Sequence, residues 1–403
     1  MTTFDTLDDL PDAQRVLVRL DLNSPVEDGI VQDNRRFERH AVTITELVDA
    51  GHSIVCMAHQ GRPGRDTFVS LKQHAEILAD HVGHDLKFVA ETFGEDALTS
   101  VRAIENGEIL LLENTRMCDE ELPEEAPQTK SDTDFVQTLA PEFDAYINDA
   151  YSSAHRSHAS LVGFPAVLPA YAGRVMETEY EANTAIAARE FDGSVTMAVG
   201  GVKATDVIDV MTSLGDTVDN FLIGGVVGQL FLRAAGYPVG YDTNPEADLY
   251  DTQWEENHNL IEDILTERRD QVTLPTDLAF EGDDGERVEA DVDDIERNNT
   301  EYLDIGTATA EQYADTIRDS EAVFTKGALG VFEDKRFSVG TVTPLEAIAE
   351  TDCFSVVGGG DTSRAIGMYG MDESDFGHVS IAGGAYIRAL TGADLIGVEM
   401  LES

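Results

Sequence analysis

Short apolar runs alternate with longer amphipathic segments along the whole chain, and this alternation limits the fold more than any other feature. It is typical of α/β proteins with parallel sheets, because each strand needs a helical crossover before the next. A chain of 403 residues is also too long for a single hydrophobic core. We therefore expect two doubly wound parallel-sheet (Rossmann-like) domains. The expected strands are Arg15–Leu22, Ser53–Ala58, Ile109–Glu113, Ala145–Asn148, Val195–Val199, Asn220–Ile223, Ala322–Thr325, Phe354–Val357 and His378–Ile381.

The junction between the two domains is expected at a helix. Pro165 and Pro169 precede Ala170–Ala187, a segment of helix-forming composition without proline. We interpret this segment as a helix that bridges the domains and carries a hinge. The first domain is then residues 1–172 and the second is residues 173–390.

Charge and composition exclude several classes of function. Acidic residues number 78 and basic residues 27, so the formal net charge is 27 − 78 = −51. Such a charge argues against binding to nucleic acid or to an anionic membrane. Only six of the basic residues are lysine, and an acidic surface with few lysines favours a cytoplasm of very high salt. The three widely spaced cysteines and the absence of a signal pattern also predict a cytoplasmic protein.

The residues that follow the strands differ between the two halves. Anion-binding side chains follow the strands of the first half, as in His59-Gln60-Gly61-Arg62, and glycines follow those of the second, as in Gly358-Gly359-Gly360. Ligands of open α/β sheets bind at the carboxyl ends of the strands. The first domain therefore offers arginine and histidine to a small anion, and the second offers backbone N–H groups to a nucleotide phosphate.

Each motif alone is weak, because a glycine turn often serves only strand-to-helix packing and Asp361 could be a mere helix cap. Their fixed order is much stronger, and across essentially its whole length the sequence resembles phosphoglycerate kinase. The motifs that carry the resemblance are Arg19-Leu20-Asp21-Leu22-Asn23, Asn34-Arg35-Arg36, His59-Gln60-Gly61-Arg62-Pro63, Leu112-Glu113-Asn114-Thr115-Arg116, Asn148-Asp149-Ala150-Tyr151, Ala154-His155-Arg156, Gly200-Gly201-Val202-Lys203, Gly330-Val331-Phe332-Glu333, Gly358-Gly359-Gly360-Asp361-Thr362 and His378-Val379-Ser380-Ile381-Ala382-Gly383-Gly384-Ala385.

The resemblance implies reversible phosphoryl transfer between 1,3-bisphosphoglycerate and ADP-Mg, which gives 3-phosphoglycerate and ATP after hinge closure. It implies a monomer, and a tail of residues 391–403 that returns to the first domain. It also implies a substrate site in the first domain, where arginine can bind phosphate bidentately. The substrate residues implied are Asp21, Asn23, Arg36, His59, Arg62, Arg116 and Arg156.

The resemblance places the nucleotide in the second domain. Lys203 would neutralise the phosphoryl group in transit, and the amides of Gly383 and Gly384 would stabilise its oxygens, so these three and Arg36 form the catalytic set. Asp361 would hold Mg²⁺, the one cofactor, and Glu333 would accept hydrogen bonds from the ribose. The other nucleotide residues implied are Gly358, Gly359, Gly360 and Thr362. To these we add Lys326 as a hypothesis of our own, that a lysine at a position where the family usually has asparagine contacts a nucleotide phosphate.

The sequence departs from the family at the nucleotide site. The family usually has a second lysine where this chain has Val207, and its usual Trp-Asn-Gly-Pro is here Thr325-Lys326-Gly327-Ala328. A catalytically inactive nucleotide-binding relative is therefore the alternative hypothesis. An NAD-dependent dehydrogenase is disfavoured, because the chain lacks the G-x-G-x-x-G fingerprint after an early strand.

The net charge predicts that the fold depends on salt. Charge repulsion extends over about 30 Å at 0.01 M salt and over about 3 Å at 1 M. Dialysis to millimolar salt should therefore lower the melting temperature and the activity. A melting temperature and activity that both survive dialysis would contradict salt adaptation.

Overall fold

The computed structural model describes residues 4–239, 248–295 and 300–402. The chain divides into two compact units, one made of Met1–Glu181 together with Asp394–Ser403 and the other of Ala182–Ala393. The division falls inside helix α6, Arg174–Ala188, whereas the sequence suggested a boundary near residue 172.

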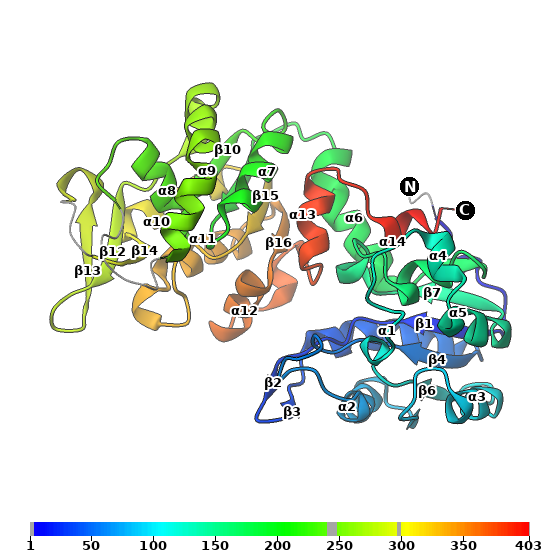
Figure 1. Ribbon diagram of the computed structural model, residues 1–403. Helices are drawn as coiled ribbons and strands as arrows, with labels where there is room; N and C mark the ends of the chain where they lie inside the picture. Colours follow the sequence, from blue (N-terminus) through cyan, green and yellow to red (C-terminus); the bar gives the residue numbers. More distant parts are fainter. Residues whose placement is uncertain (1–3, 240–247, 296–299, 403) are drawn as a thin grey trace. The chain divides into compact units, whose positions relative to one another are not determined.

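A six-stranded parallel sheet forms the centre of the first unit (Figure 1). Its strand order is β5-β6-β4-β1-β7-β8, and every pairing is parallel. The apolar runs make its inner strands fully buried, as expected for a sheet covered on both faces. The strands are β1 Arg15–Arg19, β4 Ser53–Met57, β5 Leu86–Phe88, β6 Ile109–Leu111, β7 Ala145–Asn148 and β8 Ala170–Ala172.

Amphipathic helices cover this sheet. Phe37 and Ile44 of α1 enter one core cluster with Val16 and Val18 of β1, whereas Tyr146 of β7 stacks on Phe164 on the opposite side of its strand. The side chain of Asn34 accepts the Arg36 N–H and so caps α1. The helices are α1 Arg35–Asp49, α2 Lys72–Val82, α3 Glu95–Arg102, α4 Pro127–Ser131, α5 Asp134–Leu139 and α14 Ile396–Glu399.

The second unit has its own six-stranded parallel sheet, in the order β11-β10-β9-β15-β16-β17. Its strands are β9 Val195–Val199, β10 Asn220–Ile223, β11 Val272–Thr273, β15 Ala322–Lys326, β16 Phe354–Gly358 and β17 His378–Val379. Its helices are α7 Ala204–Leu214, α8 Gly225–Ala234, α9 Asp248–Glu267, α10 Thr307–Arg318, α11 Val339–Ala349, α12 Gly360–Met368 and α13 Gly384–Leu390.

Antiparallel strands supplement the parallel sheets. In the second unit, β12 Asp277–Glu281 pairs with both β13 Arg287–Asp291 and β14 Tyr302–Ile305. In the first, β2 Val26–Glu27 pairs with β3 Ile30–Val31. The sequence analysis missed these strands, because they are short or rich in charged residues.

The predicted fold class of two parallel-sheet domains is confirmed, and all nine predicted strands are present. One local prediction was wrong, since Ala170–Ala172 forms the edge strand β8 and the helix begins only at Arg174. Three residues pairing at a sheet edge leave too short a pattern to separate from the helix that follows. None of the helices in the described part of the chain combines the length and the hydropathy that a bilayer-spanning helix needs.

The C-terminal segment packs on the first unit. The Gly397 N–H donates to the Ala154 carbonyl at 2.7 Å, and the Asn148 side chain donates to the Gly397 carbonyl at 3.2 Å. Ile396 and Met400 pack against a buried cluster that contains Leu161. The segment therefore covers the loops that follow β7.

Deletion of residues 394–403 should destabilise the first unit. It exposes the partners of Val398 and Leu401, both buried, and a buried aliphatic side chain contributes roughly 1.5–3 kcal/mol. Thermal unfolding in molar KCl should show a melting temperature lower by several degrees, with 3-phosphoglycerate turnover reduced more than nucleotide binding. Glu399→Ala, an exposed change in the same helix, is the control, and an unchanged melting temperature in the deletion would contradict the prediction.

Candidate active site

The polar residues of the first unit meet where its strand order reverses. Strands β4 and β7 flank β1 on opposite sides, and doubly wound sheets bind their ligands in the crevice outside the carboxyl ends of the strands at such a reversal, here β1 and β7. Asp21 follows β1 and Ser152 follows β7, and the Ser152 hydroxyl donates to the Asp21 carboxylate. This bond joins the two loops that border the crevice.

Asp21 organises the surrounding cations. Its carboxylate pairs with Arg36 and also accepts the Asn23 N–H at 3.0 Å. Burial alone would raise the pKa of Asp21, but Arg36 and the Ser152 hydroxyl hold it below its usual range. Asp21 therefore stays ionised and fixes the position of the Arg36 guanidinium.

Arg19, the last residue of β1, is buried beneath this crevice. It donates to Ser160 Oγ at 2.8 Å and to His59 Nδ1 at 3.1 Å. Ser160 in turn donates to the buried carboxylate of Glu121 at 2.6 Å, which supplies the opposite charge. Burial, with the neighbouring arginines, lowers the pKa of His59 well below its ordinary value, so His59 is neutral and accepts from Arg19.

Two further arginines lie beside Gly61. Arg116 donates to the Gly61 carbonyl, while the Gly61 N–H donates to Asn23 Oδ1 at 2.8 Å. Burial together with Arg19 and Arg62 lowers the pKa of Arg116 to about 10. Arg62 is itself exposed. Within the described residues neither Arg62 nor Arg116 forms an ion pair, whereas Arg36 and Arg156 each have a carboxylate partner, so positive charge is concentrated here, as an anion site requires.

Arg156 lies at the margin of the same cluster. Its Nη1 donates to Glu124 at 2.9 Å, and this Glu124 oxygen lies 3.9 Å from Nε2 of His158. Both side chains of the ion pair are more than a third exposed, so a stronger anion could displace Glu124.

His40 is a buried residue to which the sequence analysis gave no role. Its Nε2 accepts the Asp21 N–H at 3.2 Å, which places the ring proton on Nδ1, 2.7 Å from Asp149 Oδ2. The other Asp149 oxygen accepts the Val175 N–H at 2.9 Å in the first turn of α6. His40 therefore ties the loop of Asp21 to the start of the helix that enters both units. The sequence contained one signal for this role, which is a histidine on the buried face of the amphipathic helix α1.

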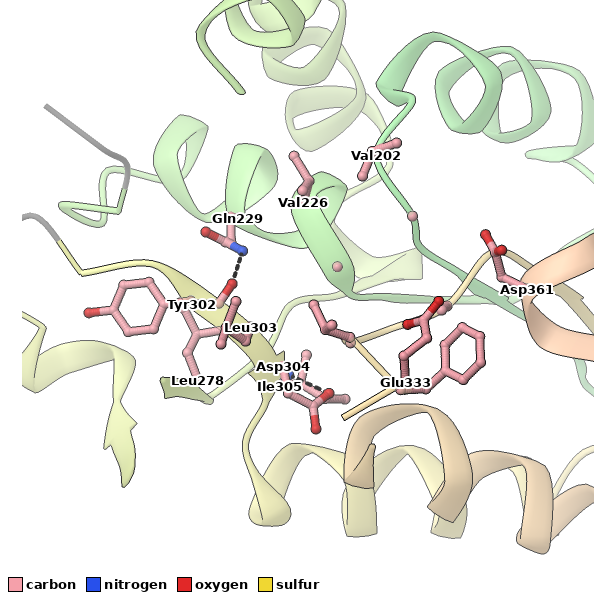
Figure 2. Close-up of a pocket in the computed structure, with 16 residues that line it drawn as sticks. Val202, Val226, Gln229, Leu278, Tyr302, Leu303, Asp304, Ile305, Glu333 and Asp361 are labelled. Atoms are coloured by element: carbon pink, nitrogen blue, oxygen red, sulfur yellow. Dashed lines mark hydrogen bonds between the residues drawn. The ribbon is translucent and has the colours of Figure 1, made fainter. Parts of the chain in front are cut away.

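The second unit contains a cavity of about 220 Å³ between its parallel sheet and its antiparallel sheet (Figure 2). Val226 of α8 and Leu278 of β12 line it, and Glu333 and Asp361 bring carboxylates to it. Gln229 of α8 donates to the Tyr302 carbonyl at 2.9 Å and so joins the walls. An apolar cavity with a few polar groups is suited to a flat heterocycle.

Glycines form the floor beside this cavity for steric reasons. A Cβ on Gly225 would lie 2.8 Å from the Gly201 nitrogen, and Gly201 has φ +86°. The N–H groups of Gly201 and Gly225 donate to carbonyls, at 2.8 and 2.9 Å. The sequence led us to expect that the glycines after the strands of the second half offer their N–H groups to a ligand, and for Gly201 and Gly225 this is wrong, because these groups donate within the protein where the loops pack against one another.

Asp304 is buried against the cavity. It accepts from Arg287 at 2.9 Å and from the Gly340 N–H at 3.0 Å, and burial raises its pKa to about 7. A Cβ on Gly330 would lie 1.9 Å from Asp304 Oδ1, so Gly330 must be glycine for its loop to reach this carboxylate.

The other candidate nucleotide residues gather at the carboxyl ends of β9, β15 and β16. Lys203 precedes α7 and is exposed, as is Asp361 in the first turn of α12. Glu333 pairs with Arg364 at 3.1 Å. Lys326 ends β15, and its Nζ lies 3.2 Å from Asp206 Oδ2.

Gly358, Gly359, Gly383 and Thr362 have local structural roles. Gly359, with φ +105°, caps α12, and Gly383, with φ +55°, caps α13 immediately before Gly384. Gly358 ends β16, where a Cβ would lie 2.0 Å from the Tyr386 ring. Gly360 has open space around it, and the Thr362 hydroxyl donates to the Gly358 carbonyl at 3.2 Å.

One unit with an arginine crevice and a second with a glycine-floored cavity define an α/β phosphotransferase. A sequence profile of the family described as phosphoglycerate kinase matches residues 7–393. The chain belongs to the phosphoglycerate kinase family.

Individual relatives support this membership. The phosphoglycerate kinase of Haloarcula marismortui is 71% identical over 400 residues, which are 99% of this chain and 100% of that protein. That of Halorubrum lacusprofundi is 70% identical over 403 residues, covering 100% and 99% of the two chains. The crystal structure of phosphoglycerate kinase from Pyrococcus horikoshii matches with a TM-score of 0.91 at 31% identity and covers 98% of each chain. The structure from Coxiella burnetii has a TM-score of 0.78 at 27% identity, with coverage of 99% and 98%.

The enzyme transfers a phosphoryl group reversibly between 1,3-bisphosphoglycerate and ADP, which gives 3-phosphoglycerate and ATP. This supports the active enzyme predicted from the sequence over the inactive nucleotide-binding alternative. The two relatives from haloarchaea also agree with the predicted salt-adapted type.

His40→Ala should lower stability and weaken the substrate site together. The change leaves the Asp21 N–H and the Asp149 carboxylate without their buried partner, and each such loss costs about 1–3 kcal/mol. Urea unfolding in molar KCl should show a lower midpoint, and the KM for 3-phosphoglycerate should rise severalfold.

His84→Ala, an exposed change outside this network, is the control. Unchanged stability and KM in His40→Ala would show that this network does not position Asp21.

Proposed function

We propose that 3-phosphoglycerate and 1,3-bisphosphoglycerate bind in the first unit, in the crevice between the ends of β1 and β7. The observation that carries the proposal is the concentration of positive charge around Asp21. His59, Arg62, Arg116 and Arg156 would bind the phosphate that is not transferred, and arginine offers it paired N–H donors. Asp21 and Asn23 would orient the hydroxyl and the carboxyl end.

Arg36 would hold the carboxyl oxygen that gives or accepts the phosphoryl group. Its contacts with Asp21 and with Ser152 hold the guanidinium between the loops that follow β1 and β7. No general base is needed, because the acceptor is already a carboxylate. Catalysis would therefore rest on positioning and on electrostatic stabilisation of an in-line transfer.

The second unit would bind ATP or ADP in the 220 Å³ cavity. Glu333 would accept from the ribose, and the nucleotide phosphates would lie toward Gly358, Gly359, Gly360 and Thr362. Lys203 and the amides of Gly383 and Gly384 would stabilise the phosphoryl group during transfer.

Asp361 is suited to Mg²⁺, because its exposed carboxylate borders the cavity at the start of α12. Magnesium commonly binds through one or two carboxylates and the substrate phosphates. The ion would neutralise charge on the nucleotide phosphates.

The substrate residues and the nucleotide residues belong to different units, so we further propose that transfer requires the units to close about α6. We also propose that the enzyme works as a monomer in the cytoplasm, without nucleic-acid or membrane partners. The net charge of −51 supports the exclusion of anionic partners.

Arg156→Ala should weaken the proposed 3-phosphoglycerate site without affecting the proposed nucleotide site. Loss of a charge-assisted hydrogen bond, about 1.5–3 kcal/mol, should raise the KM for 3-phosphoglycerate by at least about tenfold and leave the KM for ATP within about twofold. A coupled assay of 3-phosphoglycerate and ATP in molar KCl measures both.

Arg102→Ala is the matched control, since Arg102 is another arginine of the first unit that pairs with a glutamate. An equal rise of both KM values in Arg156→Ala would refute the assignment of this cluster to one ligand.

A further inference from the structure

Lys326 occupies the topological switch point of the second sheet. Strand β15 lies between β9 and β16, and the Cα of Lys326 pairs with Val199 on one side and with Gly358 on the other. Strands β10 and β11 continue the sheet beyond β9, and β16 and β17 continue it in the other direction, so the order reverses between β9 and β15. Ligands of doubly wound sheets bind outside the strand ends at such a point.

The backbone around Lys326 is closely packed and hydrogen-bonded. Its carbonyl accepts the Gly200 N–H at 2.9 Å, and a Cβ on the next residue, Gly327, would lie 2.5 Å from the Gly200 carbonyl oxygen. Gly327 also has φ +77°. The base of the lysine side chain is therefore held in one place, which suits a residue that must aim a charge.

The ammonium group reaches the first turn of α7. Lys326 Nζ lies 3.2 Å from Asp206 Oδ2, and the relative exposures of the two side chains are 14% and 37%. A single, partly hydrated carboxylate is a weak partner that a phosphate with more charge can replace. The lysine is thus more buried than the carboxylate that it meets.

The first turn of α7 contains no basic residue, and the nearest one in the sequence is Lys203, which precedes the helix. Val207, in the same turn, has an apolar side chain and is fully buried. The sequence has only six lysines, and β15 delivers one of them to the residue before Val207. The neighbouring strand therefore brings a second positive charge, beside that of Lys203, to the start of α7.

We propose that Lys326 binds the β- or γ-phosphate of the nucleotide and exchanges Asp206 for it when nucleotide binds. The lysine then supplies to ADP and ATP a charge that AMP, with only its α-phosphate, cannot use. This inference rests on the proposed binding of nucleotide by the second unit and adds the residue that discriminates phosphate number.

The competing explanation is a structural ion pair that only joins β15 to α7. Lys326→Met and Asp206→Asn both break this pair, but only the first removes the ammonium group. The two explanations therefore predict different nucleotide affinities for the pair of variants, although both allow similar losses of stability.

The test measures dissociation constants of AMP, ADP and ATP with Mg²⁺ by calorimetry in molar KCl. Lys326→Met should weaken ADP and ATP by about tenfold or more and AMP by less than about twofold. Asp206→Asn should weaken none of the three. Lys326→Arg should recover most of the loss, and Lys335→Ala, an exposed lysine of the same unit, should match the wild type.

Equal affinities for ADP in Lys326→Met and the wild type, or equal losses in Lys326→Met and Asp206→Asn, would overturn the proposal. If Lys326→Met does not fold, Lys326→Gln replaces it, since its polar side chain keeps part of the hydrogen bonding. Failure of the wild type to bind ATP would instead refute the nucleotide site itself. The 3-phosphoglycerate KM should stay within about twofold in every folded variant.

Discussion

Both sites depend on one constraint, which is that all strands of a parallel sheet end at the same edge. Residues far apart in the chain are thereby brought together wherever the strand order reverses. In the first unit this reversal lies beside β1, where Asp21 meets Ser152. In the second it lies beside β15, where Lys326 meets the glycine loop after β9. Two sheets of the same design therefore present different chemistry, because different residues follow their strands.

Hydrogen bonds among buried polar groups fix the positions of the side chains in the first site. Arg19 and Glu121 are both buried, and Ser160 links them through hydrogen bonds. His40 links the Asp21 loop to Asp149 and so to the first turn of α6. Since an unpaired buried polar group costs more than a hydrogen bond contributes, each partner specifies the position of the next. The chain has a net charge of −51, yet positive charge stays concentrated in the crevice. Hydrogen bonds and ion pairs to buried residues, such as those of Arg19 with Ser160 and of Arg36 with Asp21, fix the arginines there.

Sequence analysis predicted the parallel strands well and the smaller elements poorly. β7, β9 and β10 have the predicted bounds, because continuous apolar runs mark strands that are buried on both faces. β8 was taken for the start of a helix, and β13, with the sequence RVEAD, carries no apolar run. Pairing with β12 stabilises β13 and also brings Arg287 to Asp304. A contact between residues 17 positions apart leaves no periodic signal in either segment.

The sequence by itself determined the fold class, the family and the residue types available for each ligand, because hydrophobic periodicity and ordered motifs are local properties. Only the tertiary structure decided which groups are free to act. The N–H groups of Gly201 and Gly225 donate within the protein, whereas Lys326 reaches Asp206, which lies 120 positions away in the sequence. His40 acquired its role in the same way, through one partner that follows β7 and another that follows β1. Hydrogen-bond partners depend on distances across the folded sheets, and these distances are set by packing that no single segment encodes.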